Sequence, residues 1–420
     1  MLLYHDIPSS KGVENALKRA KQMVRVGYTP VADMPLCYSL RVGGGDRGYS
    51  YSHAAPFFPL HGVVYSSVRR VERYVGYNIS LETYLTALSN PNSIIYTRKI
   101  EGTGQNVLSY YGIVCSCFAS YVHDLPYRTP NDRWTKLPSV TEVDTSKLEN
   151  LRLCDALQVL SPAHTHIAVI TDIERDVEGK VQYITVSESV MPFCRETRFS
   201  AEEFRGYWLN DGYHAYRNAN VDRVTYTPSP FVPLEDDPEM PAPEINRSLM
   251  PDFGNKANYI LGVEPVELSV FDAACDTVAV IAPDGSETLY PVSDGKVVVK
   301  PETVGFYSAC CLKGGARSAS VEWCVVGLTG TLNKEVYDFG EEVKVRFSNP
   351  AGDRIIAYQF STCDNDRGCG SDYLDVTATE GELTLAAPKK SGKVFLFLIA
   401  QNRFGDYTTS RVEFEVRAKQ

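Results

Sequence analysis

A proline-rich acidic segment divides this chain into two parts with different sequence patterns. The stretch TPSPFVPLEDDPEMPAPEI, residues 227–245, holds six prolines and five acidic residues in 19 positions. Proline fixes φ and donates no backbone hydrogen bond, so such a stretch is excluded from helix interiors and central strands. We expect an extended acidic linker at residues 227–255. The length of 420 residues is that of two or three domains.

The part before the linker, residues 1–226, mixes helix and strand patterns. Apolar residues recur at helical spacing in residues 12–26 and 112–124, and Ser80 is a suitable N-cap for a helix in ISLETYLTAL. Two strands, THIAVITDI (165–173) and KVQYITVSES (180–189), flank the polar connection ERDVEG. Helices followed by antiparallel strands predict an α+β domain.

The part after the linker has almost no helical signal. Short β-rich runs such as TVAVIA, EVKVRF and RVEFEV alternate with turn signals such as PDG and NPAGD. Two segments, 256–327 and 328–420, each have the length and pattern of a small β-sandwich of the immunoglobulin-like type. We therefore expect two all-β modules behind the α+β domain.

Composition removes several classes of function. The net charge is −10 and no cluster of lysine and arginine is present, which argues against a nucleic acid partner. No apolar run approaches the roughly 18 residues that cross a bilayer, and MLLYHDIPSS lacks the pattern of a secretory signal. Eleven cysteines without CxxC pairs indicate neither a disulfide scaffold nor a zinc module, so we expect no metal site.

Two cysteines lie two positions apart in YYGIVCSCFASYVHDLP, residues 110–126. A cysteine in an apolar helix is most often structural. Cys115, however, falls in the first helical turn, where the helix dipole and free N–H groups stabilise a thiolate. We expect Cys115 to be reactive, and Cys117, two residues further into the helix, to have only a packing role.

A thiolate nucleophile needs a base that exchanges protons near neutral pH, and imidazole is the usual one. Of the seven histidines, His166 opens an apolar strand, where regular structure would hold its ring at a cleft. His164, two residues earlier, is expected in a loop. His166 is therefore the predicted base.

A carboxylate beside that imidazole would orient it and stabilise its charged form. A hairpin centred on Val177 pairs His166 with Glu188 and Ile170 with Ile184, which places the apolar residues on one face. A slip of one residue would bring Ser187 or Ser189 opposite instead. Glu188 is the predicted third residue, and the two serines stay open as alternatives.

These residues together resemble the NlpC-type cysteine peptidases of the papain-like superfamily. The resemblance covers roughly residues 55–220: a tyrosine in HGVVYSS, then GIVCSCF opening a helix, then HIAVI on a strand and a polar residue on the next strand. It implies an α+β papain-like (NlpC-type) catalytic domain with Cys115 as nucleophile, His166 as base and Glu188 as the polar third residue. It also implies a catalytic role for Tyr65.

The motif departs from the family pattern at two positions. Val114 stands where the family usually has an acid, and Cys117 where it usually has glycine. In members that cleave cell-wall peptides, the acid and the following serine hold the free amine of the substrate. The resemblance therefore implies substrate binding by Ser116 and leaves the nature of the substrate open.

We expect a cysteine hydrolase that cleaves an amide or peptide bond through a thioester, with bacterial peptidoglycan stem peptides as the leading substrate. The alternatives are a papain-fold acyltransferase or amidase acting on a non-wall substrate, and a catalytically silent surface-binding protein. The chemistry needs no cofactor. The β modules suit binding to the cell envelope, and we expect an extracellular or envelope location.

Overall fold

The computed structural model describes the chain in parts, which form two compact units. The described residues are 2–41, 47–54, 57–66, 74–77, 79–96, 111–125, 128–161, 164–230, 232, 234, 257–270, 274–364, 367–402 and 404–418. One unit is Met1–Asp252 with Cys311–Ala319, and the other is Phe253–Cys310 with Ser320–Gln420. The described helices include none long and apolar enough to span a bilayer.

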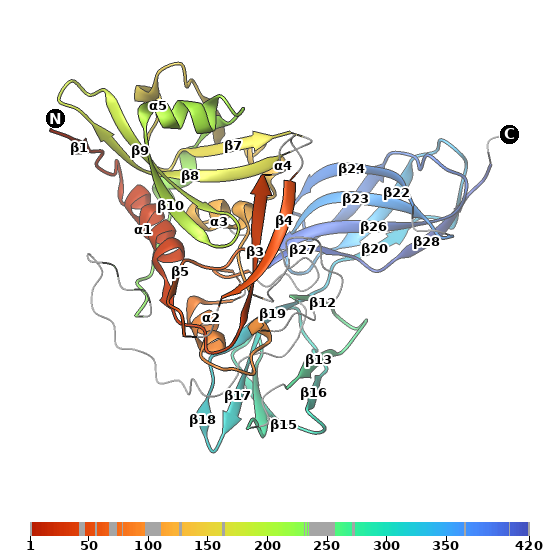
Figure 1. Ribbon diagram of the computed structural model, residues 1–420. Helices are drawn as coiled ribbons and strands as arrows, with labels where there is room; N and C mark the ends of the chain where they lie inside the picture. The colour runs from red at the N-terminus through yellow and green to blue at the C-terminus, as the bar shows by residue number, and fades with distance from the viewer. Residues whose placement is uncertain are drawn as a thin grey trace. The chain divides into compact units, whose positions relative to one another are not determined.

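The N-terminal unit is built from short helices and a large sheet (Figure 1). Its helical elements are α1 (Lys11–Arg25), α2 (Leu81–Leu88), η1 (Ile94–Tyr96), α3 (Cys115–Val122), α4 (Asn131–Trp134), η2 (Leu148–Asn150), α5 (Ala201–Phe204), η3 (Arg205–Leu209, a π-helical turn) and η4 (Ala219–Arg223). Its strands are β1 (Tyr4–His5), β2 (Gly27–Tyr28), β3 (Met34–Arg41), β4 (Arg47–Ala54), β5 (Leu60–His61), β6 (Val140–Val143), β7 (Ala156–Leu160), β8 (Thr165–Arg175), β9 (Val181–Ser189), β10 (Cys194–Ser200) and β11 (His214–Asn218).

An antiparallel sheet forms the centre of this unit. The strand order is β10-β9-β8-β7-β11-β6, and β1 pairs with the far end of β8. Helices α1 and α3 pack on this sheet and on each other (Figure 1). The first of them begins where Ser10 accepts a hydrogen bond from Val13 N, and its buried stripe runs from Val13 through Ala16 and Ala20.

Most predicted elements of this unit are present. The helix expected at 12–26 is α1, Ser80 caps α2 through Thr83 N, and the two predicted strands are β8 and β9. The helix expected at 112–124 is α3, which begins three residues later than predicted. This later start makes Cys115 the first helical residue.

The predicted hairpin register was wrong by two residues. In the structure Ile170 lies opposite Val186 and not opposite Ile184, and a bulge shifts the pairing again before Asp172. A slip of two residues keeps every side chain on its own face, because the side-chain period of a strand is two. The apolar face of the hairpin is therefore as predicted, although the directly opposed pairs are not.

From residue 257 onward, the elements of the described residues are all strands. They are β12 (Asn258–Ile260), β13 (Val266–Ser269), β14 (Thr277–Ile281), β15 (Glu287–Pro291), β16 (Lys296–Val299), β17 (Gly305–Lys313), β18 (Ala316–Arg317), β19 (Val321–Val326), β20 (Thr329–Leu332), β21 (Val336–Tyr337), β22 (Val343–Ser348), β23 (Arg354–Thr362), β24 (Gly368–Val376), β25 (Glu380–Leu385), β26 (Gly392–Asn402), β27 (Gly405–Thr408) and β28 (Val412–Val416). Strand β17 runs across the boundary of the two units, and β18 is counted with the first.

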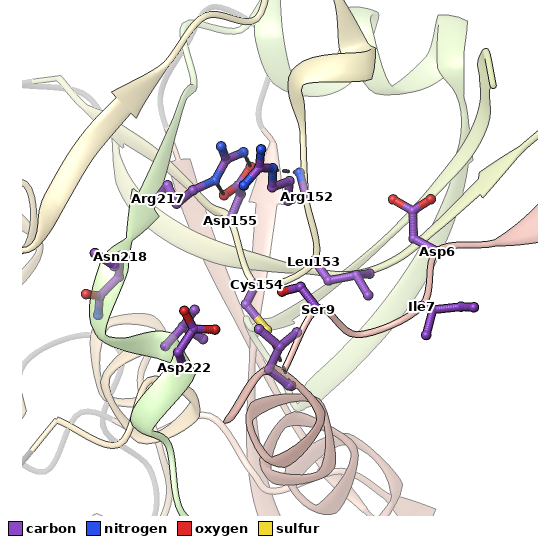
Figure 2. A pocket seen from close by; sticks show the side chains of 13 residues that line it. Asp6, Ile7, Ser9, Arg152, Leu153, Cys154, Asp155, Arg217, Asn218 and Asp222 are labelled. Carbon is purple, nitrogen blue, oxygen red and sulfur yellow. Dashed lines mark hydrogen bonds and ion pairs between the residues drawn. The ribbon is translucent and has the colours of Figure 1, made fainter. Parts of the chain in front are cut away.

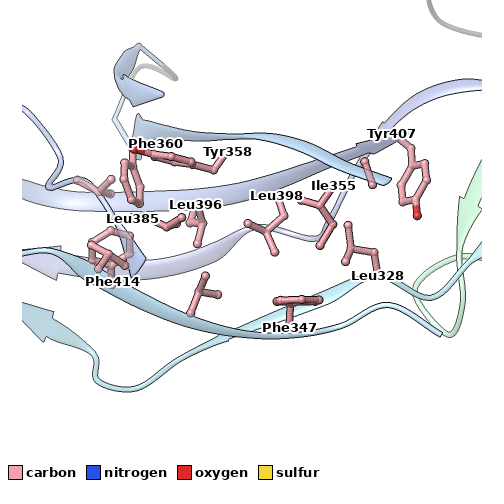
Figure 3. Close-up of a cluster of buried hydrophobic side chains, with 14 of the residues drawn as sticks. Leu328, Phe347, Ile355, Tyr358, Phe360, Leu385, Leu396, Leu398, Tyr407 and Phe414 are labelled. Carbon is pink, nitrogen blue, oxygen red and sulfur yellow. The ribbon is translucent and has the colours of Figure 1, made fainter. Parts of the chain in front are cut away.

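Sheets in this unit pack as β-sandwiches, as the strand patterns predicted. Around residues 328–418, the sheet β20-β22-β25 and the sheet β21-β28-β26-β23-β24 enclose one apolar core, in which Phe347, Phe360 and Leu398 are buried (Figure 3). Cys324 and Val326 of the preceding strands join the same core. The domain boundaries at 226, 255 and 327 stay predictions, and most of the linker lies outside the described residues.

The chain just before α3 is held close to a second segment that carries Tyr65. Gly112 and Ile113 run beside residues 64–66, where Ile113 N donates to Val64 O at 3.0 Å and Tyr65 bridges to Ile113. A Cβ atom on Gly112 would lie 2.5 Å from Ser66 Cβ and 2.8 Å from Val64 O. Glycine is required here because the two backbones approach too closely for any side chain.

The substitution Gly112→Ala should therefore destabilise the unit and disturb the start of α3. We expect urea unfolding to show a loss of about 1–3 kcal/mol, the usual effect of overpacking. Gly27→Ala is the matched control, since its Cβ would meet only the His61 ring at 3.5 Å, an ordinary contact. Equal unfolding midpoints for the two variants would contradict this account of Gly112.

Candidate active site

A cleft in the N-terminal unit brings the predicted catalytic residues together. Its volume is about 230 Å³. The side chains come from the start of α3, from the adjacent ends of β8, β9 and β10, and from η3 and the turn after it. The residues that line it are Tyr65, Cys115, His164, Thr165, His166, Glu188, Val190, Met191, Arg195, Tyr207, Trp208, Asp211 and Tyr213.

Cys115 stands at the N-terminus of α3. The N-cap residue, Val114, supplies no side-chain hydrogen bond to the first turn. The first N–H groups of a helix have no partner within the helix, and the helix dipole is positive at this end. A negative charge on the Cys115 sulfur, or on an oxygen next to it, therefore lies where backbone donors favour it.

His166 connects Cys115 to Glu188. Its Nε2 atom lies 2.7 Å from Glu188 Oε2, and the Cys115 thiol is the other side chain that raises the pKa of the imidazole. Since Nε2 faces the carboxylate, Nδ1 is the nitrogen left for the thiol. All three side chains are nearly buried, with 7%, 8% and 4% of Cys115, His166 and Glu188 exposed.

The pKa values of the three groups move in the directions that favour a thiolate and an imidazolium. Burial alone would raise the pKa of the Cys115 thiol, but the hydrogen bond and charge of His166, together with the Asn131 amide, bring it below its usual value. Burial alone would lower the pKa of His166, but Cys115 and Glu188 raise it. The Glu188 carboxyl, despite its burial, has a lowered pKa because it faces two cations, His166 and Arg195.

Arg195 completes the pairing of the buried carboxylate. It lies directly opposite Glu188 on the neighbouring strand β10, and its Nε and Nη2 atoms are 3.0 and 2.9 Å from Glu188 Oε1. Both carboxylate oxygens are thus used, one by His166 and one by Arg195. A buried carboxylate is costly unless it is paired and hydrogen-bonded in this way.

The imidazole ring packs against two other aromatic rings. His164 stacks on His166 with ring centroids 6.0 Å apart, and Trp208 stacks on it at 6.4 Å. Tyr213 contacts all three rings, and its hydroxyl is 2.7 Å from His164 Nε2. This packing leaves the His166 ring few orientations other than the one that faces the thiol.

The other predicted residues fall in different places. Tyr65 lines the cleft, and its backbone bridges to Ile113, two residues before the nucleophile. Ser116 is buried in the first turn of α3 and is not among the lining residues. The alternatives to Glu188 are used elsewhere: Ser187 contacts Thr171 Oγ1 at 2.8 Å, and Ser189 donates to Ile113 O at 2.7 Å.

Several residues of the cleft were not found from the sequence. His164 lies in a loop before β8, as expected, but the sequence did not show that its ring stacks on His166. Arg195 and Asn131 carried no sequence signal at all, because each reaches the site through pairing or packing of distant segments. The aromatic density of FRGYWLNDGYHAYR was the one available signal for Trp208 and Tyr213.

The other described cysteines lack such surroundings. Cys154 and Cys194 are buried, and burial raises the pKa of both thiols, that of Cys194 to about 12. Cys154 borders a second cavity of about 230 Å³ near the start of α1, where Arg217 forms two hydrogen bonds to Asp155 (Figure 2). Arg217 already pairs with both oxygens of Asp155 in this cavity. We therefore take the Cys115 cleft as the candidate active site.

Among the described residues, three possible metal ligands lie together outside the cleft. They are His5, Asp172 and Glu174, on the paired strands β1 and β8. Both oxygens of Glu174 accept hydrogen bonds from Arg198, and His5 Nδ1 already contacts Asp172 at 2.8 Å. These existing pairs use the atoms that a cation would need.

Comparisons with known proteins do not assign the chain to a family. No family model and no curated protein matches it. Similar solved structures include the interferon gamma receptor alpha chain of chicken (12% identity, 40% of this chain and 98% of that one, TM-score 0.20). They also include the fibronectin(III)-like modules of Clostridium thermocellum CbhA (17% identity, 40% of this chain and 92% of that one, TM-score 0.20). A third is the sulfur carrier protein SoxY of Chlorobium limicola f thiosulfatophilum (14% identity, 22% of this chain and 79% of that one, TM-score 0.16). TM-scores this low do not establish a common fold.

The lowered thiol pKa predicts that iodoacetamide labels Cys115 at a pH where other thiols are protonated. Labelling follows the thiolate fraction, so its midpoint should lie below the ordinary cysteine pKa of about 8.5. His166→Ala should move the midpoint upward, because burial then dominates the pKa of the thiol. Peptide mass spectrometry reports Cys115 and Cys194 in the same sample. Similar labelling profiles for these two cysteines would refute the thiolate assignment.

Glu188→Gln should weaken the interaction between the Cys115 thiol and the His166 imidazole, while the side chain at position 188 keeps its shape. The neutral amide no longer favours the imidazolium, so the pKa of His166 should fall and the labelling midpoint of Cys115 should rise. Glu142→Gln is the matched control, since Glu142 also pairs with a histidine, His214, at 2.6 Å, but on the surface. An unchanged midpoint in Glu188→Gln would mean that the carboxylate does not act on the pair.

Proposed function

We propose that this chain is a cysteine hydrolase that cleaves an amide or peptide bond through a covalent thioester. The observation that carries the proposal is the buried group Cys115, His166 and Glu188, in which His166 Nε2 lies 2.7 Å from the carboxylate, the pKa of the thiol is lowered and that of the imidazole is raised. Nucleophile, base and orienting carboxylate in this order are the requirements for acyl transfer to sulfur.

The reaction would begin with attack of the Cys115 thiolate on the carbonyl carbon of the amide. The carbonyl electrons move to oxygen, and the intermediate collapses when the C–N bond breaks and His166 gives its proton to the leaving amine. His166 then takes a proton from water, which attacks the thioester and releases the acid. Glu188 stays ionised throughout and stabilises the imidazolium, and Arg195 holds Glu188 in place.

The oxyanion would be stabilised at the start of α3. The Cys115 N–H stands at the free end of the helix, and Val114 places no side chain oxygen on these donors. The second oxyanion donor in this proposal is the Tyr65 hydroxyl, for which the family resemblance implies a catalytic role, and its support is that Tyr65 lines the cleft.

The proposed catalytic domain is of the papain-like, NlpC-type class. What supports it is the order of the motif residues and their convergence: a tyrosine beside the nucleophile segment, cysteine at a helix start, histidine on β8 and a polar residue on β9. We propose peptidoglycan stem peptides as the substrate, with the β-sandwich modules binding the cell envelope. An extracellular or envelope location is part of the same proposal.

A second candidate, an amidase or acyltransferase that acts on a non-wall substrate, is favoured by one observation. Val114 is nearly buried and apolar where cell-wall members of the resembled family carry an acid. The lining of the cleft includes Tyr207, Trp208 and Met191. A cleft with these side chains suits an apolar group on the substrate. A silent binding protein would have no need of the coupled thiol and imidazole.

Incubation with purified peptidoglycan, followed by mass spectrometry of the released fragments, tests the leading proposal. We expect stem-peptide fragments from the wild-type protein and a loss of at least about a thousandfold in Cys115→Ala. Cys363→Ser, which alters a cysteine of the C-terminal unit, is the matched control and should keep full activity.

The same variants distinguish the candidates. Cys115-dependent turnover of small amides or thioesters without any release from peptidoglycan would favour the second candidate. If Cys115→Ala keeps every activity of the wild type, both enzyme proposals are wrong.

A further inference from the structure

One side chain outside the predicted site touches the sulfur of the nucleophile. Asn131, the first residue of the short helix α4, directs its Nδ2 donor at Cys115 Sγ across 3.6 Å. This amide is one of the groups that bring the pKa of the thiol below its usual value. It is separate from the histidine, the carboxylate and the tyrosine discussed so far.

The position of Asn131 is determined by the strands that carry the base. Gln158 of β7 is 2% exposed and donates through Nε2 to the backbone oxygen of Asn131 at 2.5 Å. Gln158 lies directly opposite Ile167, the residue next to His166. Helix α4 also packs on β7 and β8 through the buried Trp134. Asn131 and His166 are thus held relative to each other by one sheet.

The donors reach the sulfur from different segments. His166 belongs to β8 and Asn131 to α4, and both lower the pKa of the thiol, as does the backbone of Ile167. An amide 3.6 Å from sulfur makes a long hydrogen bond. When a substrate carbon bonds to Sγ, however, the carbonyl oxygen comes to lie one bond further out, where such a donor can reach it.

We propose that Asn131 is a catalytic residue, whose side-chain amide stabilises negative charge first on the Cys115 sulfur and then on the oxygen of the tetrahedral intermediate. In the attack step the C–S bond forms, the carbonyl electrons move to oxygen, and this oxygen accepts hydrogen bonds from Asn131 Nδ2 and Cys115 N–H. When the C–N bond breaks, the electrons return and the amine leaves with the proton of His166. Stabilisation of the oxygen of the intermediate rests on the proposed hydrolase function, whereas stabilisation of the charge on the Cys115 sulfur does not.

The first test measures the sulfur alone and needs no substrate. The pH profile of Cys115 labelling by iodoacetamide is compared for wild type, Asn131→Ala and the isosteric Asn131→Asp. We expect the midpoint to rise in Asn131→Ala and to rise further in Asn131→Asp, because a carboxylate beside the sulfur opposes the thiolate. Asn92→Ala, an exposed asparagine far along the chain from Asn131, should keep the wild-type profile.

A variant that fails to fold is replaced by a milder one. Gln158→Ala leaves the amide intact and removes only the hydrogen bond that holds Asn131, so its labelling midpoint should shift in the same direction by a smaller amount. Urea unfolding of each variant is measured alongside. Wild-type labelling profiles in folded Asn131→Ala and Asn131→Asp would overturn the inference, whatever the protein hydrolyses.

The second test uses any amide whose turnover depends on Cys115. Asn131→Ala should lower kcat by about 10²–10³ with KM nearly unchanged, the usual effect of losing one oxyanion donor. A rise in KM with kcat unchanged, or no change in either constant, overturns the oxyanion role. If the wild type hydrolyses nothing, the proposed function fails, and the labelling profiles still decide whether Asn131 acts on the sulfur.

Discussion

The site depends on a row of four groups whose charged forms alternate in sign: the Cys115 thiol, the His166 imidazole, the Glu188 carboxyl and the Arg195 guanidinium. Three of these side chains are almost completely buried, and a buried charge is stable only beside an opposite one. Each member therefore sets the protonation of the next. Without Arg195 the carboxyl has one cation instead of two, and without Glu188 only Cys115 is left to raise the pKa of the buried imidazole.

The rest of the N-terminal unit holds this row in place. The pairing of β9 with β10 places Arg195 opposite Glu188, and β8 lies between β9 and β7, so that the base and the segment tied to Asn131 share one sheet. The thiol comes from another direction, at the start of α3, and the close approach of Gly112 to residues 64–66 determines where that helix begins. The stacked rings of His164 and Trp208 then restrict the imidazole. The Cys115 side of the cleft is held by these backbone and ring contacts, whereas another part of the lining comes from the π-helical turn η3 and includes the exposed Tyr207.

Sequence reasoning succeeded where a local pattern was sufficient and failed where strands had to be aligned. Ser80 and the apolar spacing of α1 identified helices, and β8 and β9 were recognised from alternation and a polar turn. The register of this hairpin was misplaced by two residues because a bulge near Asp172 and the exact turn are invisible in a single sequence. Glu188 nevertheless reaches His166, since a slip of two leaves it on the same face and a glutamate side chain spans the diagonal.

By itself, the sequence determined three helices and two strands of the first unit, the all-β pattern of the second, and a cysteine at a helix start and a histidine on a strand. These follow from periodicity, capping residues and turn chemistry, which act over a few residues. The order of helices first and strands after was wrong, because β1 to β5 precede α2. Only the tertiary structure decided that His164, Trp208, Arg195 and Asn131 surround that pair. The physical reason is that a pKa and a ring orientation are set by neighbours in space, and these neighbours come from strands and turns far apart in the chain.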